Sequence, residues 1–187
     1  MEIKKNISNF NRIQIDRWEE KGYLLKIKKG FYALAEQDID QSFSFLAANR
    51  IYHPSYVSLE KALKYYGLIP EEIFQITSVS TKKATEFKTP VGNFRYRHIS
   101  PKLFWAYRLI KTSKNKFLIA EPEKAILDYL YLHAKLKTSF DFKEMRVDKD
   151  SFEEHINIPK FQKYLKAFNN KSLMKRAHTF LDTIQND

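Results

Sequence analysis

The chain has 187 residues, enough for one medium-sized domain or for a small domain joined to a larger one. It contains no cysteine, which excludes disulfides, cysteine-ligated zinc, iron–sulfur clusters and thiol nucleophiles. A net charge of +11 favours a polyanionic partner such as nucleic acid, although a lysine-rich solvated surface explains the same surplus.

We expect neither a metal nor any other cofactor. The histidines are scattered without the spacing of a metal site on one helix, and the four glycines cannot form a phosphate-cradling loop. No apolar run approaches the roughly 18 to 20 residues of a membrane-spanning helix. The first residues also lack the apolar core of a secretory signal, so the expected location is the cytoplasm.

A short helix followed at once by a basic β-hairpin is predicted for residues 1–36. Ser8 or Asn11 can cap a helix that runs to about Lys21. Residues 23–34 then alternate apolar side chains with lysines around a glycine, which is typical of a hairpin.

Residues 37–187 predict a larger α/β (α+β) domain with a small mixed sheet and C-terminal helices. The residues after Glu36 are polar and form the best candidate linker, and Ser58 stands where it can cap a helix. The predicted helices cover 41–52, 58–66, about 122–133 and most of the chain after 151, and the predicted strands cover 56–57, 74–79, 93–99 and 116–120.

The helix and hairpin are the most informative local pattern, because winged-helix modules place such a helix in the major groove of DNA and rest the hairpin on phosphates. Arginine pairs with guanine, asparagine and glutamine pair with adenine, and lysine neutralises phosphates. The candidate DNA contacts are Asn11, Arg12, Gln14 and Arg17 on the helix and Lys26, Lys28 and Lys29 on the hairpin. The alternative is a helix–hairpin cap on the larger domain, since too few residues precede it for a complete winged helix.

A second basic block covers residues 81–118, which carry a net charge of +9. Its candidate surface residues are Lys82, Lys83, Arg95 and Arg97. Arg95 and Arg97 share one face of a strand, so Phe94, Tyr96 and His98 are expected on the opposite, buried face. The two arginines can bind RNA or DNA phosphate, or they can pair with carboxylates such as Glu121 and Glu123.

The carboxylates of residues 120–128 are the place where an enzyme would keep an acid and a base. Glu123 and Asp128 are about 140° apart around a helix and do not share a face, whereas Lys124 and Asp128 do and can pair. Acidic residues also favour the first turn of a helix, so we expect no catalytic residues and no enzyme.

Four segments, in the same order, resemble the AbiEi-type antitoxins, a family of predicted transcriptional regulators of viral defence systems. They are WEEKGYLLKIKKGFY (18–32), SYVSLEKALKYYGLIP (55–70), FRYRHI (94–99) and IAEPEKAILD (119–128). The resemblance implies a winged-helix segment that represses its own operon, here residues 1–36 in a shortened form. It also implies an antitoxin domain, here residues 37–187. The family's toxin is a nucleotidyltransferase-like protein that is neutralised without a stable complex, as in type IV systems.

The expected function is therefore a DNA-binding autoregulator and antitoxin, with operator DNA as its partner and a homodimer binding inverted half-sites. The main alternative is a module that does not bind DNA and counteracts a toxin through contacts of its C-terminal domain with protein or RNA. An enzyme with chemistry at Glu121, Glu123 and Asp128 is the third hypothesis.

Overall fold

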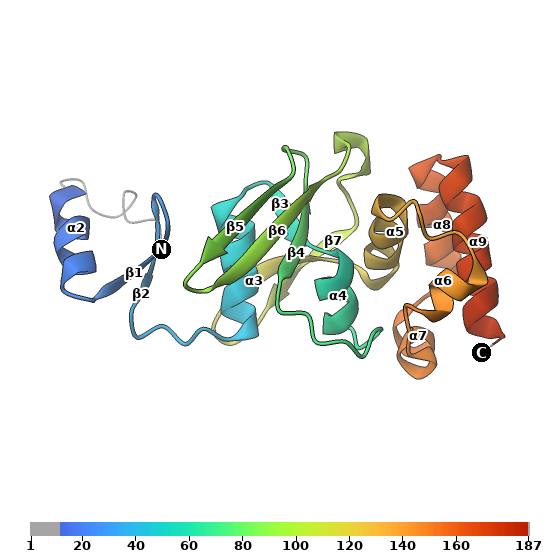
Figure 1. Ribbon diagram of the computed structural model, residues 1–187, viewed down its shortest axis with the longest axis horizontal. Helices are drawn as coiled ribbons and strands as arrows, with labels where there is room; N and C mark the ends of the chain where they lie inside the picture. Colours follow the sequence, from blue (N-terminus) through green and yellow to red (C-terminus); the bar gives the residue numbers. More distant parts are fainter. Residues whose placement is uncertain (1–11, 187) are drawn as a thin grey trace.

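The computed structural model describes residues 12–186, which form a mixed α/β fold with its elements layered along the long axis (Figure 1). A helix–hairpin unit, residues 12–34, lies at one end. Helix α3, a six-stranded sheet, helix α5 and a final layer of C-terminal helices follow in that order. This arrangement places the helix–hairpin unit at the opposite end from the C-terminal helices.

The helix–hairpin unit folds as its sequence predicts. The N–H of Gly22 donates to Glu19 at 3.0 Å and the N–H of Tyr23 donates to Trp18 at 2.9 Å, with Gly22 left-handed at φ 72°. This Schellman arrangement ends the helix and turns the chain into the hairpin. The elements are α2 (Arg12–Glu20), β1 (Leu24–Lys28) and β2 (Phe31–Leu34).

The central sheet has the strand order β5-β6-β4-β3-β8-β7. Strand β3 is parallel to β8, and β4 is parallel to β6, while the remaining neighbours are antiparallel. The sheet is therefore mixed, as predicted. The strands are β3 (Ser55–Val57), β4 (Ile76–Ser80), β5 (Thr85–Thr89), β6 (Gly92–His98), β7 (Tyr107–Lys111) and β8 (Lys116–Ala120).

Helices cover the two faces of this sheet. Tyr96 points to the face that α3 covers, where its hydroxyl donates to the carbonyl of Ala48 at 2.7 Å. Tyr56 points to the other face, where its hydroxyl donates to Asp128 of α5 at 3.0 Å. The covering helices are α3 (Gln41–Ile51), α4 (Leu59–Tyr65) and α5 (Pro122–Leu132), with a short 3-10 helix at Pro101–Leu103.

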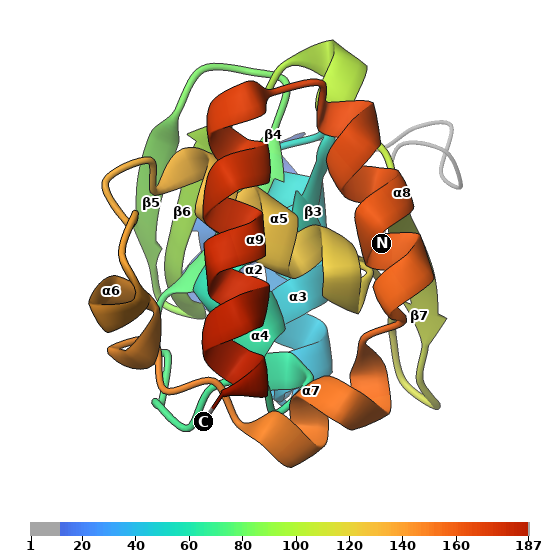
Figure 2. The same cartoon turned by 90° about the vertical axis from the view of Figure 1, so that its right-hand side faces the viewer.

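The C-terminal helices pack on the side of α5 that faces away from the sheet (Figure 2). The apolar stripes predicted for this region are buried, which confirms their inward orientation: Phe161, Leu165, Phe168, Leu173, Ala177, Phe180, Leu181 and Ile184. The helices are α6 (Ser139–Lys143), α7 (Lys149–His155), α8 (Ile158–Phe168) and α9 (Lys171–Gln185).

The segment between β2 and α3 is held against the β7–β8 hairpin. Lys114 pairs with Asp38 at 2.7 Å, and the side-chain amide of Asn115 donates to the hydroxyl of Ser42 at 2.9 Å. Asp40 then caps α3 by accepting the N–H of Phe43 at 2.7 Å. These contacts anchor the segment that connects the helix–hairpin unit to α3 at the end next to α3.

Three local expectations need correction. The side chain of Ser58 does not cap α4; its hydroxyl instead donates to Asp128 at 2.9 Å. His98 is exposed rather than buried, because it is the last residue of β6 and its Nδ1 reaches the carbonyl of Lys82, 3.0 Å away. The edge strands β5 and β7 were not among the predicted strands.

Candidate nucleic-acid interface

The exposed face of α2 carries two of the predicted base contacts. Gln14 and Arg17 are both exposed, but Asp16 and Glu20 are exposed on the same short helix. Asn11 lies outside the described residues, and only the backbone of Arg12 is described. The helix therefore offers groups that can read bases without a strong positive charge of its own.

The three hairpin lysines have different environments. Lys29 is exposed beside the turn at Gly30. Lys26 pairs with Glu19 of α2 at 3.1 Å, and the hydrogen bond that its ammonium donates to this carboxylate raises the pKa of Lys26 above its usual value. Lys26 thus joins the hairpin to the helix, whereas Lys29 is open to an external phosphate.

Lys28 contacts the α/β domain. Its ammonium donates to the carbonyl of Ile51 at 3.4 Å and lies 3.7 Å from the ring centroid of Phe87 in β5. Burial, together with the positive charge of Lys82, lowers the pKa of Lys28. A cation over an aromatic face is attracted by the ring quadrupole, so Lys28 attaches the hairpin to the edge of the sheet.

The loop between β4 and β5 meets the hairpin at this point. The ammonium groups of Lys82 and Lys28 lie over the same ring, 5.4 and 5.9 Å from the centroid of Tyr52. The hydroxyl of Tyr52 donates to the carbonyl of Lys83 at 2.8 Å, and Lys83 itself is exposed. Two basic blocks that are far apart in the sequence therefore adjoin in space.

Tyr52 and Phe87, which bring them together, were not among the predicted site residues. No local pattern marks them, because each belongs to a different element and neither has a charged or catalytic group. The sequence pointed to this region only through its two lysine-containing basic blocks, one in the hairpin and one starting between β4 and β5.

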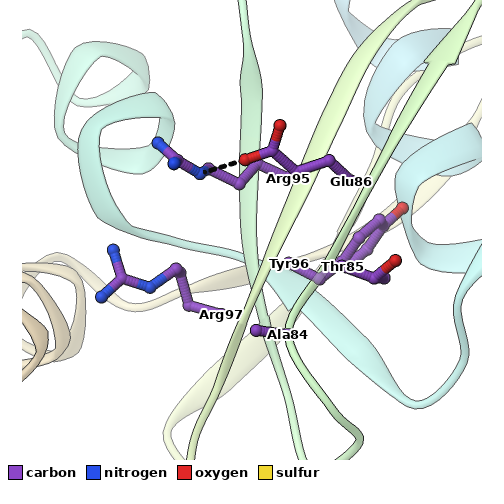
Figure 3. Close-up of a pocket in the computed structure, with 6 residues that line it drawn as sticks. All are labelled: Ala84, Thr85, Glu86, Arg95, Tyr96 and Arg97. Carbon is purple, nitrogen blue, oxygen red and sulfur yellow. Dashed lines mark ion pairs between the residues drawn. The ribbon is translucent and has the colours of Figure 1, made fainter.

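Arg95 and Arg97 project to the same side of β6, as predicted (Figure 3). Arg95 pairs with Glu86 of the neighbouring strand at 2.7 Å, and Arg97 donates to the carbonyl of Leu132 at the end of α5 at 3.4 Å. The expected partners Glu121 and Glu123 were wrong, because α5 presents its carbonyl end to β6. The hollow here has a volume of about 310 Å³ and is lined by Ala84, Thr85, Glu86, Arg95, Tyr96 and Arg97.

The carboxylates considered for an enzyme all have internal partners. Glu121 accepts a hydrogen bond from Tyr164 at 2.5 Å and pairs with Lys160 at 3.0 Å. Glu123 pairs with Lys160 at 3.1 Å. Asp128 pairs with Lys124, which confirms the predicted pair one helical turn apart.

That last pair is completely buried. Burial raises the pKa of Asp128 and lowers the pKa of Lys124, because the low-dielectric interior disfavours both charged forms. The rings of Trp105 and Phe168 cover the ammonium, with centroids 5.1 and 4.9 Å away. The surrounding side chains therefore close both groups off from solvent.

Within residues 12–186, no group of three acidic or histidine side chains is placed to hold a metal ion. The same residues contain no helix that combines the length and the apolar character needed to cross a membrane. No protein-family model matches the chain, and no curated protein matches it either. The helix–hairpin unit and the adjoining lysines form the candidate interface of the described residues.

Proposed function

We propose that the chain is a DNA-binding transcriptional autoregulator of the cytoplasm, and that it serves as the antitoxin of a type IV toxin–antitoxin, phage-defence system. The helix–hairpin unit supplies the contacts to operator DNA. In this proposal the protein has no catalytic role, and its toxin is a nucleotidyltransferase-like protein with which it forms no stable complex.

The observation that carries the DNA-binding part is the position of the helix–hairpin unit. It lies at one end of the molecule, with Gln14, Arg17 and Lys29 exposed to an approaching ligand (Figure 1). A helix beside a two-stranded hairpin matches the way winged-helix modules meet a duplex, with base edges read by the helix and phosphates bound by the hairpin.

The antitoxin part rests on the resemblance of four segments to the AbiEi-type family. Those segments contain the end of α2 with most of its hairpin, the β3–α4 unit, most of β6 and the junction of β8 with α5. Since three of the four lie in the α/β domain, we assign the neutralising activity to residues 37–187.

A fluorescence-anisotropy titration of the full chain with duplex DNA from upstream of its own gene tests the DNA-binding part. We expect a preference for that duplex over a scrambled one, and a logarithm of affinity that falls linearly with the logarithm of salt concentration. Arg17→Ala should reduce the preference, whereas Lys166→Ala, an exposed substitution at the far end of the molecule, should not. A salt slope near zero contradicts phosphate binding.

A growth assay tests the antitoxin part separately. The chain is co-expressed with the nucleotidyltransferase-like protein encoded beside it, if one is present, and residues 37–187 should contain what restores growth. Full protection by the Arg17→Ala chain would show that neutralisation does not require reading of the operator.

The engagement of Lys26 and Lys28 within the protein favours a second candidate, a toxin-counteracting module that binds protein or RNA but not DNA. In that case the helix–hairpin unit is a structural cap. The same titration separates the two functions, because the module predicts no preference for upstream DNA while the growth assay still shows protection.

A further inference from the structure

Lys28 and Lys82 are placed together by two different parts of the molecule. Their ammonium groups share the ring of Tyr52, and the positive charge of Lys82 acts on Lys28. Within residues 12–186, no carboxylate forms an ion pair with either lysine. Two like charges held close together without an anion are mutually unfavourable.

Both ammonium groups keep donors available. An ammonium has three N–H donors, of which Lys28 uses one for the carbonyl of Ile51. Within the described chain, Lys82 makes no side-chain hydrogen bond. An anion with two acceptor oxygens can therefore bind to both lysines without displacing the contact of Lys28.

The backbone around Lys82 is held in place before any ligand arrives. His98 reaches the carbonyl of Lys82 with Nδ1, at 3.0 Å, and the hydroxyl of Ser80 accepts the N–H of Lys82 at 3.1 Å. Tyr52 holds the next carbonyl, that of Lys83. Because this loop is fixed by side chains, little conformational entropy is lost when a ligand binds to it.

We propose that Lys28 and Lys82 together bind one phosphate diester of a DNA backbone, at a site shared between the helix–hairpin unit and the sheet. The proposal rests on the proposed DNA-binding function, and it adds that the α/β domain contacts the same duplex. Lys29 and Lys83, the residues that follow Lys28 and Lys82, are exposed, and we expect them to extend the site to neighbouring phosphates. A duplex bound there ties the unit to the sheet in one orientation.

The test is a double-mutant cycle on the full chain, with duplex affinity measured over a salt series. Lys28→Gln and Lys82→Gln should each weaken binding several-fold and reduce the salt slope by about 0.9, the value for one neutralised phosphate. The double variant should also lose only about 0.9, because both lysines serve the same phosphate. A loss of about 1.8 in the double variant overturns the shared site.

Lys88→Gln is the matched control. This substitution removes the same charge. Lys88 is exposed and lies on the same edge strand as Phe87, but its side chain points to the opposite face of the sheet. It should leave the slope nearly unchanged. If Lys82→Gln behaves like Lys88→Gln, the proposal is wrong. Lys82 is exposed, so its substitution does not depend on the hairpin remaining docked.

The choice of duplex separates this proposal from the proposed function. If Lys82→Gln reduces the salt slope on a scrambled duplex as well, and the chain shows no preference for upstream DNA, the phosphate site is supported and the autoregulator is contradicted. A preference for upstream DNA, with an affinity and a salt slope that neither lysine affects, does the reverse. If duplex RNA shows the Lys82 dependence and duplex DNA does not, the site takes an RNA backbone and the DNA assignment fails.

Discussion

Lys124 and Asp128 form an ion pair with both side chains fully buried, and the carboxylate also accepts hydrogen bonds from Tyr56 at 3.0 Å and Ser58 at 2.9 Å. Removing two charges from water is costly, and mutual attraction with well-placed hydrogen bonds offsets that cost. The pair joins α5 to β3 and to the start of α4, so we expect the stability of the whole α/β domain to depend on it.

Asp128→Leu should lower the free energy of unfolding by about 3 to 5 kcal/mol, because it leaves the ammonium of Lys124 buried without an anion. Adding Lys124→Met should recover part of this loss, since no unpaired charge then remains. Urea denaturation of the single and double variants measures both effects. Lys166→Met, on the exposed side of α8, serves as the control. A double variant less stable than Asp128→Leu would show that the charge of Lys124 is tolerated alone.

Arg176 stabilises the C-terminal end of α5 from α9. Its guanidinium is buried and donates to the carbonyls of Leu130 at 2.5 Å and His133 at 3.5 Å, where the helix dipole also favours a cation. Arg176→Met should lower the free energy of unfolding by about 1 to 3 kcal/mol, because it leaves the buried carbonyl of Leu130 without this donor. Lys175→Met, at the exposed position just before Arg176, should have little effect in the same thermal or urea unfolding measurement.

Asp40 gives the protein an acid-sensitive helix cap. Its pKa lies below the ordinary value because the carboxylate accepts the N–H of Phe43 and the hydroxyl of Ser42. A depressed folded-state pKa means that the unfolded chain binds the proton more readily. The stabilisation is therefore present above the unfolded pKa of about 3.9 and is lost as pH falls through the folded value.

Asp40→Asn should keep the cap at neutral pH, because asparagine is as good an N-cap as aspartate. It should also reduce the loss of stability between about pH 5 and about pH 2. Urea midpoints of both proteins across this range test the prediction. Parallel pH profiles for the two proteins would mean that Asp40 does not contribute to acid unfolding.

Lys28→Met should loosen the helix–hairpin unit from the sheet. Methionine keeps an apolar stem against Phe87 but loses the charge over the ring and the hydrogen bond to Ile51. A glutamate-specific protease should then cleave after the exposed Glu36 faster than in the unsubstituted chain. Lys29→Met, at the neighbouring exposed position, should leave the cleavage rate unchanged. Equal rates for all three proteins would show that Lys28 does not hold the unit.

Much of the fold follows from local pattern. The predicted strand at 116–120 coincides with β8, and Pro122 begins α5 as expected from its fixed φ. The spacing of Lys124 and Asp128 predicted their pairing, because residues four apart meet on a helix. Burial of the pair was not predictable, since it depends on Trp105 and Phe168 from other elements.

The edge strands show where local pattern fails. Strand β5 and strand β7 each pair with a single neighbour and mix charged, polar and apolar residues over only five positions. Such short, half-exposed segments have little signal of their own. The contact of Lys28 with Phe87 could not be predicted from local pattern either, because it forms only after the hairpin and the sheet edge have been brought together.

The anchored linker has a consequence for how strongly Lys28 must bind. Because Lys114 holds Asp38 and Asn115 holds Ser42, only a few residues separate the hairpin from a fixed point on the β7–β8 hairpin. A short tether of this kind raises the local concentration of the hairpin at the sheet edge to the millimolar range, roughly. The few contacts of Lys28, with the rings of Phe87 and Tyr52 and the carbonyl of Ile51, are then sufficient to keep the unit in place. A unit that detaches is recaptured by the same chain before it meets another.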